Sequence, residues 1–278
     1  MKKALIVGGT SPRGMYLMRG LAEAGFNVLN VGLLGPEEGT DVLKLKTFAP
    51  PKDMINLMHV RPGDARKYHT VESWFLDLVP DIIHFMVSAP GSASHVKTRL
   101  SSLTNVLAAM DAFYNTSTIM VHQPYPFSSD VKTAMNILER VLLRSDTHKC
   151  KAILVKYGDV FCPGGTTDSL NVMIHDAITA GSEKALFDDA PGPAGVLGNY
   201  VQLWVENLVR ASKDPKACEP DYEISNPPLV KREEILCALN AVNPAFKIND
   251  GTKKLEPEKP VLDMVRACHD AYMELTRR

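Results

Sequence analysis

Ala4-Leu5-Ile6-Val7-Gly8-Gly9-Thr10-Ser11-Pro12-Arg13-Gly14 is an apolar run that leads through a glycine-rich turn into the start of a helix. The apolar residues suit a buried parallel strand, and the glycines let the backbone turn sharply and approach a ligand. Ser11 suits the N-cap of the helix, and Pro12 suits its first position. Free backbone N–H groups and the positive end of the helix favour a bound phosphate. We therefore predict a dinucleotide-binding turn; the alternative is a tight turn without a ligand.

The second predicted strand, Asn27–Leu33, bears on the choice of coenzyme. An acidic side chain that binds the ribose is expected at its end, about 20 residues past the glycines, but Gly32 occupies that position. Arg13 in the turn is able to pair with a ribose 2′-phosphate. An ordinary solvated arginine is an equal alternative, and Glu37 or Glu38 could still reach the ribose. We therefore expect NADP(H) in preference to NAD(H).

The composition of the 278 residues limits the classes of function. An apolar content of 45% supports a packed core. A formal net charge of -1 without a basic block argues against nucleic acid as a partner. No segment is long and apolar enough to span a bilayer, and no leader with a cleavage site is recognisable, so we expect a cytoplasmic protein. The cysteines and histidines lack metal-ligand spacing, so we expect no bound metal.

Strand and helix patterns alternate through the first half of the chain. This order predicts a doubly wound α/β fold, in which helices cover both faces of a parallel sheet. The expected strands are 5–7, 27–33, 56–60, 82–87, 118–122, 152–157 and 223–225, and the expected helices are 12–24, 71–78, 100–114, 131–143, 203–212, 231–240 and 260–276. We expect a dinucleotide-binding domain over residues 1–161, and a segment over 162–278 that completes the sheet and forms a small cap on the substrate side.

Four motifs, in order along the chain, resemble those of the extended short-chain dehydrogenase/reductase family, the NAD-dependent epimerase/dehydratase group. The similar segments are residues 8–14 (the TGxxGxxG turn), 62–64 (the GD motif), 80–89 (the PDxViHlAA strand) and 156–164 (the RpgNvyGPG segment). The resemblance implies that Asp64 bonds the adenine and that Lys156 lies near the nicotinamide. The coenzyme contacts that we expect are Gly8, Thr10, Ser11, Pro12, Arg13, Gly14, Asp64, Val87, Ser88 and Lys156.

The resemblance also implies a Ser–Tyr–Lys catalytic set, in which the tyrosine transfers a proton and the lysine lowers the pKa of the tyrosine. We align Glu139 with the glutamate that often follows the family's lysine by four residues. Val131 then stands at the tyrosine position and Met135 at the lysine position. Neither side chain can move a proton, so we predict a nonstandard site.

Three residues at the end of the strand over 118–122 are candidate substitutes for the missing groups. The phenol of Tyr125 is able to donate a proton if a cation lies close. His122 has an ordinary pKa suited to acid–base chemistry, although a lone histidine at a strand end is more often structural. We predict that Tyr125 or His122 handles the proton and that Gln123 bonds the reacting oxygen.

The leading hypothesis is an NAD(P)-dependent oxidoreductase or epimerase-like enzyme that acts on a small hydroxyl- or carbonyl-bearing substrate. The missing catalytic groups keep two alternatives open: a coenzyme-binding regulator or assembly partner without catalysis, and a non-redox cyclase or lyase in the same pocket. The sequence does not separate these two. The resemblance further implies a homodimer that forms through the helices over residues 100–114 and 131–143.

Overall fold

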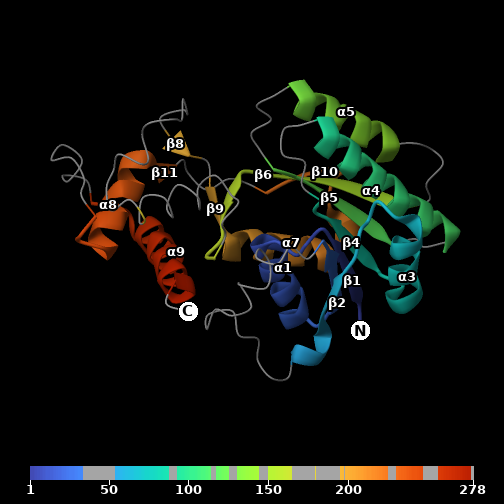
Figure 1. The fold of residues 1–278 in the computed structure, drawn as a ribbon, viewed down its shortest axis with the longest axis horizontal. Coiled ribbons are helices and arrows are strands. Elements are labelled where there is room, and N and C mark those ends of the chain that lie inside the picture. Colours follow the sequence, from blue (N-terminus) through green and yellow to red (C-terminus); the bar gives the residue numbers. More distant parts are fainter. Residues whose placement is uncertain are drawn as a thin grey trace. The chain divides into compact units, whose positions relative to one another are not determined.

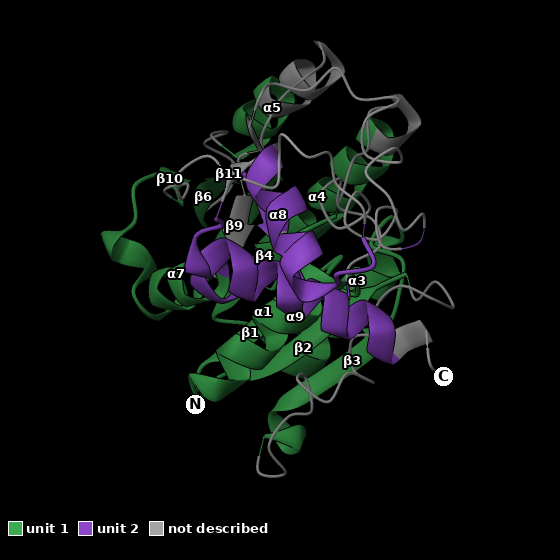
Figure 2. Cartoon of the chain, turned by 90° about the vertical axis from the view of Figure 1, so that its left-hand side faces the viewer, with its two compact units in different colours: residues 1–39, 50–156, 205–224 green, residues 40–49, 157–204, 225–278 purple. Residues whose placement is uncertain are grey.

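Two compact units make up the chain (Figure 2). Unit 1 comprises residues 1–39, 50–156 and 205–224, and unit 2 comprises residues 40–49, 157–204 and 225–278. This computed structural model describes residues 1–33, 54–87, 93–113, 117–124, 130–143, 150–164, 179, 195–196, 198–224, 230–246 and 256–276. The assignment of a coenzyme role to one part and a substrate role to the other stays a prediction.

A seven-stranded sheet forms the centre of unit 1, with the order β10-β6-β5-β4-β1-β2-β3. The pairs β1–β2, β1–β4, β2–β3, β4–β5 and β6–β10 are parallel. The strands are β1 (Lys3–Val7), β2 (Asn27–Gly32), β3 (Met58–Pro62), β4 (Ile82–Phe85), β5 (Thr118–Pro124), β6 (Lys151–Tyr157) and β10 (Asp221–Glu223). The direction of the chain across the sheet reverses at β1, which confirms the predicted doubly wound fold.

Helices cover both faces of this sheet (Figure 1). One face carries α1 (Pro12–Glu23) and the part of α7 (Val201–Lys213) that belongs to unit 1, and a Cβ atom on Gly20 of α1 would overlap Val205 of α7. The other face carries a row of three neighbouring helices: α3 (Tyr68–Leu78), α4 (Ala93–Ala112) and α5 (Asp130–Leu143). Two 3-10 helices, η2 (Ile55–Leu57) and η4 (Pro215–Ala217), complete the described elements of unit 1.

One core cluster of unit 1 lies between the sheet and the row of three helices. Val7 and Phe85 from the strands pack in one buried cluster with Trp74 and Phe75 from α3 and with Leu103 from α4. Each of these side chains is at most 1% exposed, and burying one such side chain contributes about 1.5–3 kcal/mol to stability. The apolar runs of the sequence therefore form the strands and helix faces that hold the sheet's carboxyl edge in place.

Several element boundaries differ from the sequence predictions, and three examples are the start of α4, the end of β4 and the span of β10. Helix α4 begins at Ala93 rather than at residue 100, because its first two turns are polar and carry no apolar periodicity. Strand β4 ends at Phe85 rather than at residue 87. Strand β10 covers Asp221–Glu223 rather than 223–225, because its register with β6 pairs Asp221 with Leu154.

The described part of unit 2 includes two neighbouring helices and two small sheets. Helices α8 (Arg232–Val242) and α9 (Lys259–Thr276) share one apolar cluster, in which Ile235 and Leu239 pack with Val265. The sheets pair β7 (Asp159–Phe161) with β9 (Gly198–Tyr200) and β8 (Gly195–Val196) with β11 (Val230–Lys231). These strands have two or three residues each, too few for a periodic pattern, so the sequence did not predict them. None of the helices in the described part of the chain has the length and apolar character that crossing a membrane requires.

Candidate functional site

The glycine-rich turn between β1 and α1 leaves no room for a Cβ atom at Gly8 or Gly14, and Gly9 is similarly crowded. Gly8 has a φ of +79°, and a Cβ atom added to it would lie 2.7 Å from the backbone nitrogen of Val87. A Cβ atom on Gly14 would overlap the carbonyl oxygen of Gly9. The Gly8 N–H donates to the carbonyl oxygen of Val31 at 2.7 Å. The turn is therefore closely packed against the ends of β2 and β4, as a cradle for a phosphate requires.

Helix α1 begins at Pro12, as predicted, and Ser11 is its N-cap residue. The Ser11 carbonyl accepts the first helical hydrogen bond, from the Met15 N–H, at 3.1 Å. Its hydroxyl makes no capping hydrogen bond, which differs from the usual role of serine at this position. The N–H groups of the first turn are thus not satisfied by the side chain of Ser11, and a phosphate oxygen could take its place.

Asn30 binds this turn from the neighbouring strand, and sequence reasoning missed it. It lies in β2 and is fully buried, and its Nδ2 donates to the carbonyl oxygen of Gly9 at 2.7 Å. The Asn30 amide therefore fixes the orientation of the peptide that follows Gly9. The sequence signal that could have pointed to Asn30 was a polar residue between apolar residues of a predicted strand.

The end of β2 shows why a ribose-binding acid is missing. A Cβ atom on Gly32 would lie 2.7 Å from Oγ1 of Thr10, so the threonine occupies the space that a larger residue would need. Thr10 Oγ1 also donates to the carbonyl oxygen of Leu33 at 3.2 Å. The predicted coenzyme contact Thr10 thus closes the turn onto β2, and residues 37 and 38 lie outside the described residues.

Arg13 lies close enough to β5 for its charge to act on a residue of that strand. Its positive charge is one of the causes that lower the pKa of His122 in β5. In the sheet order, β5 lies on the opposite side of β1 from β2, whereas a ribose 2′-phosphate would lie beside the end of β2. The pairing of Arg13 with a ribose 2′-phosphate stays a prediction.

Asp64, the expected adenine contact, pairs with Arg66 in the loop between β3 and α3. The Arg66 guanidinium donates from Nε and Nη2 to both carboxylate oxygens of Asp64, at 2.7 to 3.0 Å. The hydrogen bond from Arg66 is the main cause that lowers the pKa of Asp64. The carboxylate is therefore held in one orientation, and an adenine would share it with Arg66.

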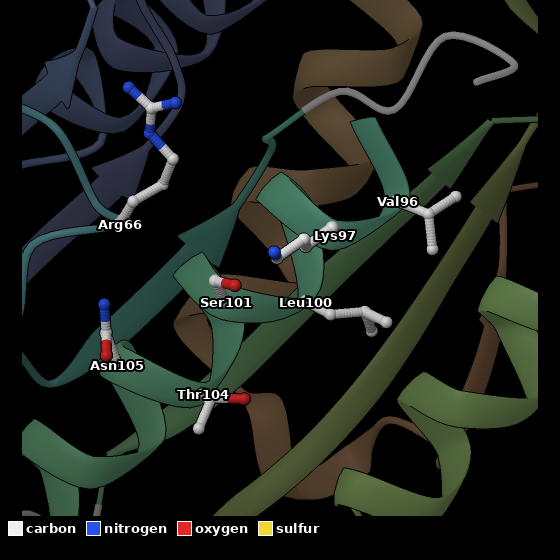
Figure 3. A pocket seen from close by; sticks show the side chains of 7 residues that line it. All are labelled: Arg66, Val96, Lys97, Leu100, Ser101, Thr104 and Asn105. Atoms are coloured by element: carbon white, nitrogen blue, oxygen red, sulfur yellow. The ribbon is translucent and has the colours of Figure 1, made fainter. Parts of the chain in front are cut away.

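A cavity of 660 Å³ adjoins this loop (Figure 3). Arg66 lies at one side of it, and Lys97, Ser101 and Asn105 of α4 lie at the other. The Asn105 side chain donates to the carbonyl oxygen of Ala65 at 2.9 Å, which ties the loop to α4. Val96, Leu100 and Thr104 complete the lining, which therefore combines apolar side chains with two cationic ones.

His122, a predicted proton-transfer residue, forms a buried hydrogen-bonded chain with His84 and Ser212. Nε2 of His122 lies 3.0 Å from Nδ1 of His84, and Nε2 of His84 lies 3.0 Å from the Ser212 hydroxyl. That hydroxyl is 2.6 Å from the carbonyl oxygen of Leu208, to which it donates. Ser212 then accepts from His84, which in turn accepts from His122, so each ring has its proton on Nε2.

Both imidazoles are neutral at neutral pH. Burial lowers the pKa of His84 to about 3. Burial also lowers the pKa of His122 well below its ordinary value, and the positive charges of Arg99 and Arg13 lower it further. A neutral, buried His122 is a weak proton acceptor, which favours the structural role that the sequence analysis kept as the alternative.

Gln123, the predicted partner of the reacting oxygen, is buried next to His122 in β5. Its Nε2 donates to Oε2 of Glu139 in α5 at 2.8 Å. Glu139 also forms a buried ion pair with Arg99 of α4. Sequence reasoning used Glu139 only to align α5 and did not find Arg99, because their contact depends on how two helices pack.

Lys156, the predicted contact near the nicotinamide, pairs with Asp221 of β10. Its Nζ lies 3.2 Å from a carboxylate oxygen of Asp221, which Arg140 of α5 also binds through two hydrogen bonds. Partial burial acts to raise the pKa of Asp221, but these two cations outweigh it and lower the pKa. Lys156 thus has a partner within unit 1, and its contact with a coenzyme stays a prediction.

Two predicted site residues, Tyr125 and Ser88, lie outside the described residues. Among the remaining predictions, the structure brings Gly8 and Val87 together at the turn and places His122 beside Gln123. No group of three or more His, Cys, Asp or Glu side chains in the described ranges could hold a metal ion. The described site therefore offers backbone N–H groups, buried neutral polar groups and the Arg99–Glu139 pair.

Comparison with solved structures finds this fold in several enzymes, some of them in complex with NAD. The Bordetella bronchiseptica enzyme WbmH, in complex with NAD+, aligns with a TM-score of 0.68 and 14% identity over 99% of both chains. A dTDP-glucose 4,6-dehydratase from Bacillus anthracis, in complex with NAD, aligns with a TM-score of 0.73 and 10% identity over 99% of this chain and 97% of that one.

A UDP-glucose 4-epimerase from Thermotoga maritima, with UDP-glucose, aligns with a TM-score of 0.68 and 12% identity over 99% of this chain and 100% of that one. No protein-family model and no curated protein matches the sequence. At these identities the likeness concerns the fold. It confirms, at that level, the resemblance to epimerases and dehydratases that the four motifs indicate.

Proposed function

We propose that the chain is a nicotinamide-dinucleotide-dependent oxidoreductase of the epimerase/dehydratase type, acting on a small substrate that bears a hydroxyl or carbonyl group. The observation that carries the proposal is the turn of residues 8–14. Its backbone packs so closely against Val87 and against itself that Gly8 and Gly14 admit no side chain. A turn of this kind at the carboxyl edge of β1 is where dinucleotide phosphates bind in doubly wound folds.

The described residues fit a nicotinamide dinucleotide. The N–H groups of the turn and of the first turn of α1 would hold the pyrophosphate, and Asp64 would accept a hydrogen bond from the adenine. When bound, the coenzyme supplies a hydride acceptor or donor. The lack of an acid at Gly32 supports NADP(H), whereas the solved structures with this fold include NAD complexes. Side-by-side titration of both coenzymes decides the preference.

For proton transfer we propose Tyr125, with Gln123 as hydrogen-bond donor to the reacting oxygen and His122 as the alternative proton carrier. The buried, uncharged state of His122 favours Tyr125 in this role. The Glu139 carboxylate holds the Gln123 amide, so its orientation is set before a substrate arrives.

A second candidate function is coenzyme binding without redox turnover, as a regulator or assembly partner, or with non-redox cyclase or lyase chemistry. The specific observation in its favour is the buried histidine chain. His122 and His84 satisfy each other and Ser212 rather than facing a substrate with a charged ring. Binding of coenzyme with no oxidation or reduction across a broad panel of carbonyl compounds and sugar nucleotides would support this candidate.

We further propose a homodimer through α4 and α5. Three large apolar side chains of α5 are exposed: Ile137 (58%), Leu138 (46%) and Val141 (64%). They lie at spacings of one, three and four residues, so they share one side of the helix. An apolar stripe of this kind on a surface helix is typical of a contact with another chain.

The test of the enzymatic proposal is turnover with Tyr125→Phe and His122→Ala variants. NADPH and NADH oxidation and substrate epimerisation are measured for the wild type and both variants. We expect Tyr125→Phe to lose most activity while it retains coenzyme binding. Full activity in both variants would show that neither residue handles the proton.

A further inference from the structure

A buried arginine joins the carboxyl ends of two central strands. Arg99 of α4 has a side chain only 3% exposed, and its Nε donates to Oε1 of Glu139, which is fully buried. Nη1 of Arg99 donates to the carbonyl oxygen of Val87, just past the end of β4. Nη2 donates to the carbonyl oxygen of His122 in β5, at 2.9 Å. One guanidinium thus bridges β4, β5 and α5.

The glutamate extends the bridge to a second point on β5. Its Oε2 accepts the hydrogen bond from Gln123, so Arg99 holds the backbone of His122 while Glu139 holds the next side chain. The guanidinium carbon also lies 5.3 Å from the centre of the Phe85 ring, over its face. The pair is therefore fixed from several directions and does not depend on one contact.

Val87 links this pair to the glycine-rich turn. A Cβ atom added to Gly8 would lie 2.7 Å from the backbone nitrogen of Val87 and 2.8 Å from its Cα, which is too close for a side chain. The neighbouring Met86 N–H donates to the carbonyl oxygen of Val7 at 2.7 Å. A movement of the strand end at Val87 would therefore disturb the turn, and Arg99 is the side chain that holds this strand end on the other side.

Packing alone does not explain a charged pair in this place. Removing two charges from water is costly, and well-packed apolar side chains of similar volume often give equal or greater stability. What an apolar pair cannot do is donate hydrogen bonds to the carbonyl oxygens of Val87 and His122. These bonds determine where the backbone of the two strand ends lies.

We propose that Arg99 and Glu139 form a positioning pair that fixes the ends of β4 and β5 against the glycine-rich turn. The pair would keep the turn in the form that receives the pyrophosphate, and it would keep the Gln123 side chain in its hydrogen bond with Glu139. This inference rests on the proposed function for its consequence in binding. Its structural part, the coupling of the strand ends to the turn, is measurable in the unliganded protein.

The test compares the wild type with the charge-free double variant Arg99→Met/Glu139→Leu. The matched control is Arg140→Met, which removes the neighbouring but exposed ion pair with Asp221. Melting temperature, coenzyme affinity by calorimetry and amide hydrogen exchange at Gly8 and Met86 are measured for all three proteins. A merely structural pair would leave the last two unchanged once the fold is retained.

We expect the double variant to keep a cooperative melt, to bind coenzyme about tenfold more weakly and to exchange the Gly8 and Met86 amides about tenfold faster. The Arg140→Met control should match the wild type in both. Exchange rates and affinity within about twofold of the wild type in a folded double variant would overturn the proposal.

If the double variant does not fold, amide exchange in the Arg99→Lys variant tests the proposal instead. Lysine keeps the charge opposite Glu139 but cannot donate to two carbonyl oxygens in fixed geometry. We expect faster exchange at Met86 in this variant, and unchanged exchange would overturn the proposal. A wild-type protein that binds no coenzyme would refute the proposed function alone, because the exchange comparison needs no ligand.

Discussion

His84 should make the protein lose stability in mildly acidic solution. The ring is fully buried, and its pKa in the folded protein is about 3 against an ordinary value of 6.5. As the pH falls below 6.5, His84 binds a proton in the unfolded chain but stays neutral in the folded chain. Stability due to the neutral ring is thus complete above pH 6.5, is lost progressively below it, and falls no further below about pH 3.

The size of the effect follows from this interval. Each pH unit within it lowers the free energy of unfolding by about 1.4 kcal/mol. His84 alone would therefore lower the free energy of unfolding by roughly 5 kcal/mol between pH 6.5 and about pH 3. His122 acts in the same direction, since its pKa is also lowered. The pKa values of Asp64 and Asp221 lie below 3.8, so these carboxylates contribute only in more acidic solution.

The assay is urea unfolding of the wild type and of His84→Gln at several pH values from about 7.5 to about 4.5. Glutamine cannot titrate, so the stability of the variant should fall less steeply, by about 1.4 kcal/mol per pH unit below pH 6.5. The control is His59→Gln, because His59 is exposed. If the free energy of unfolding of the wild type and of His84→Gln fell equally steeply with decreasing pH, the assignment of a neutral, buried His84 would be refuted.

Three further predictions concern the turn and the apolar stripe of α5. Gly14→Ala should weaken coenzyme binding about tenfold in calorimetry, because its Cβ atom would overlap the Gly9 carbonyl; unchanged affinity would contradict the packing. Asn30→Asp replaces the donor to that carbonyl with an acceptor, and should lower the free energy of unfolding by about 1–3 kcal/mol in urea; equal stability would contradict a structural bond. Ile137→Asp/Val141→Asp should convert a dimer to a monomer in light scattering without lowering the melting temperature, and an unchanged dimer mass would place the interface elsewhere.

The sheet and the turn were predictable because their signals are local. Residues 4–14 contain the strand, the turn and the helix start within eleven positions, and short-range sterics and burial determine all three. The apolar runs of residues that form β4 and β5 were equally clear local signals of a strand. The start of α4 was missed because its first turns, Ala93–Arg99, are polar, and a helix without an apolar stripe has no periodic signal.

The contacts of the candidate site were not predictable because they join distant segments. The bond between His84 and Ser212 spans 128 positions, and the Arg99–Glu139 pair spans 40. Both depend on which helix packs beside which strand. Sequence reasoning placed His122 and Gln123 at the right strand end, but burial and hydrogen-bond partners, which set their chemistry, come from tertiary packing.

Backbone N–H resonances of residues 8–16, followed during titration with NAD+ and NADP+, test the central claim that this turn holds the phosphates of a dinucleotide. The account predicts saturable shifts that are largest for the N–H groups between Gly9 and Met15, with one coenzyme bound per chain. Resonances that stay unmoved at millimolar concentrations of both coenzymes would contradict it.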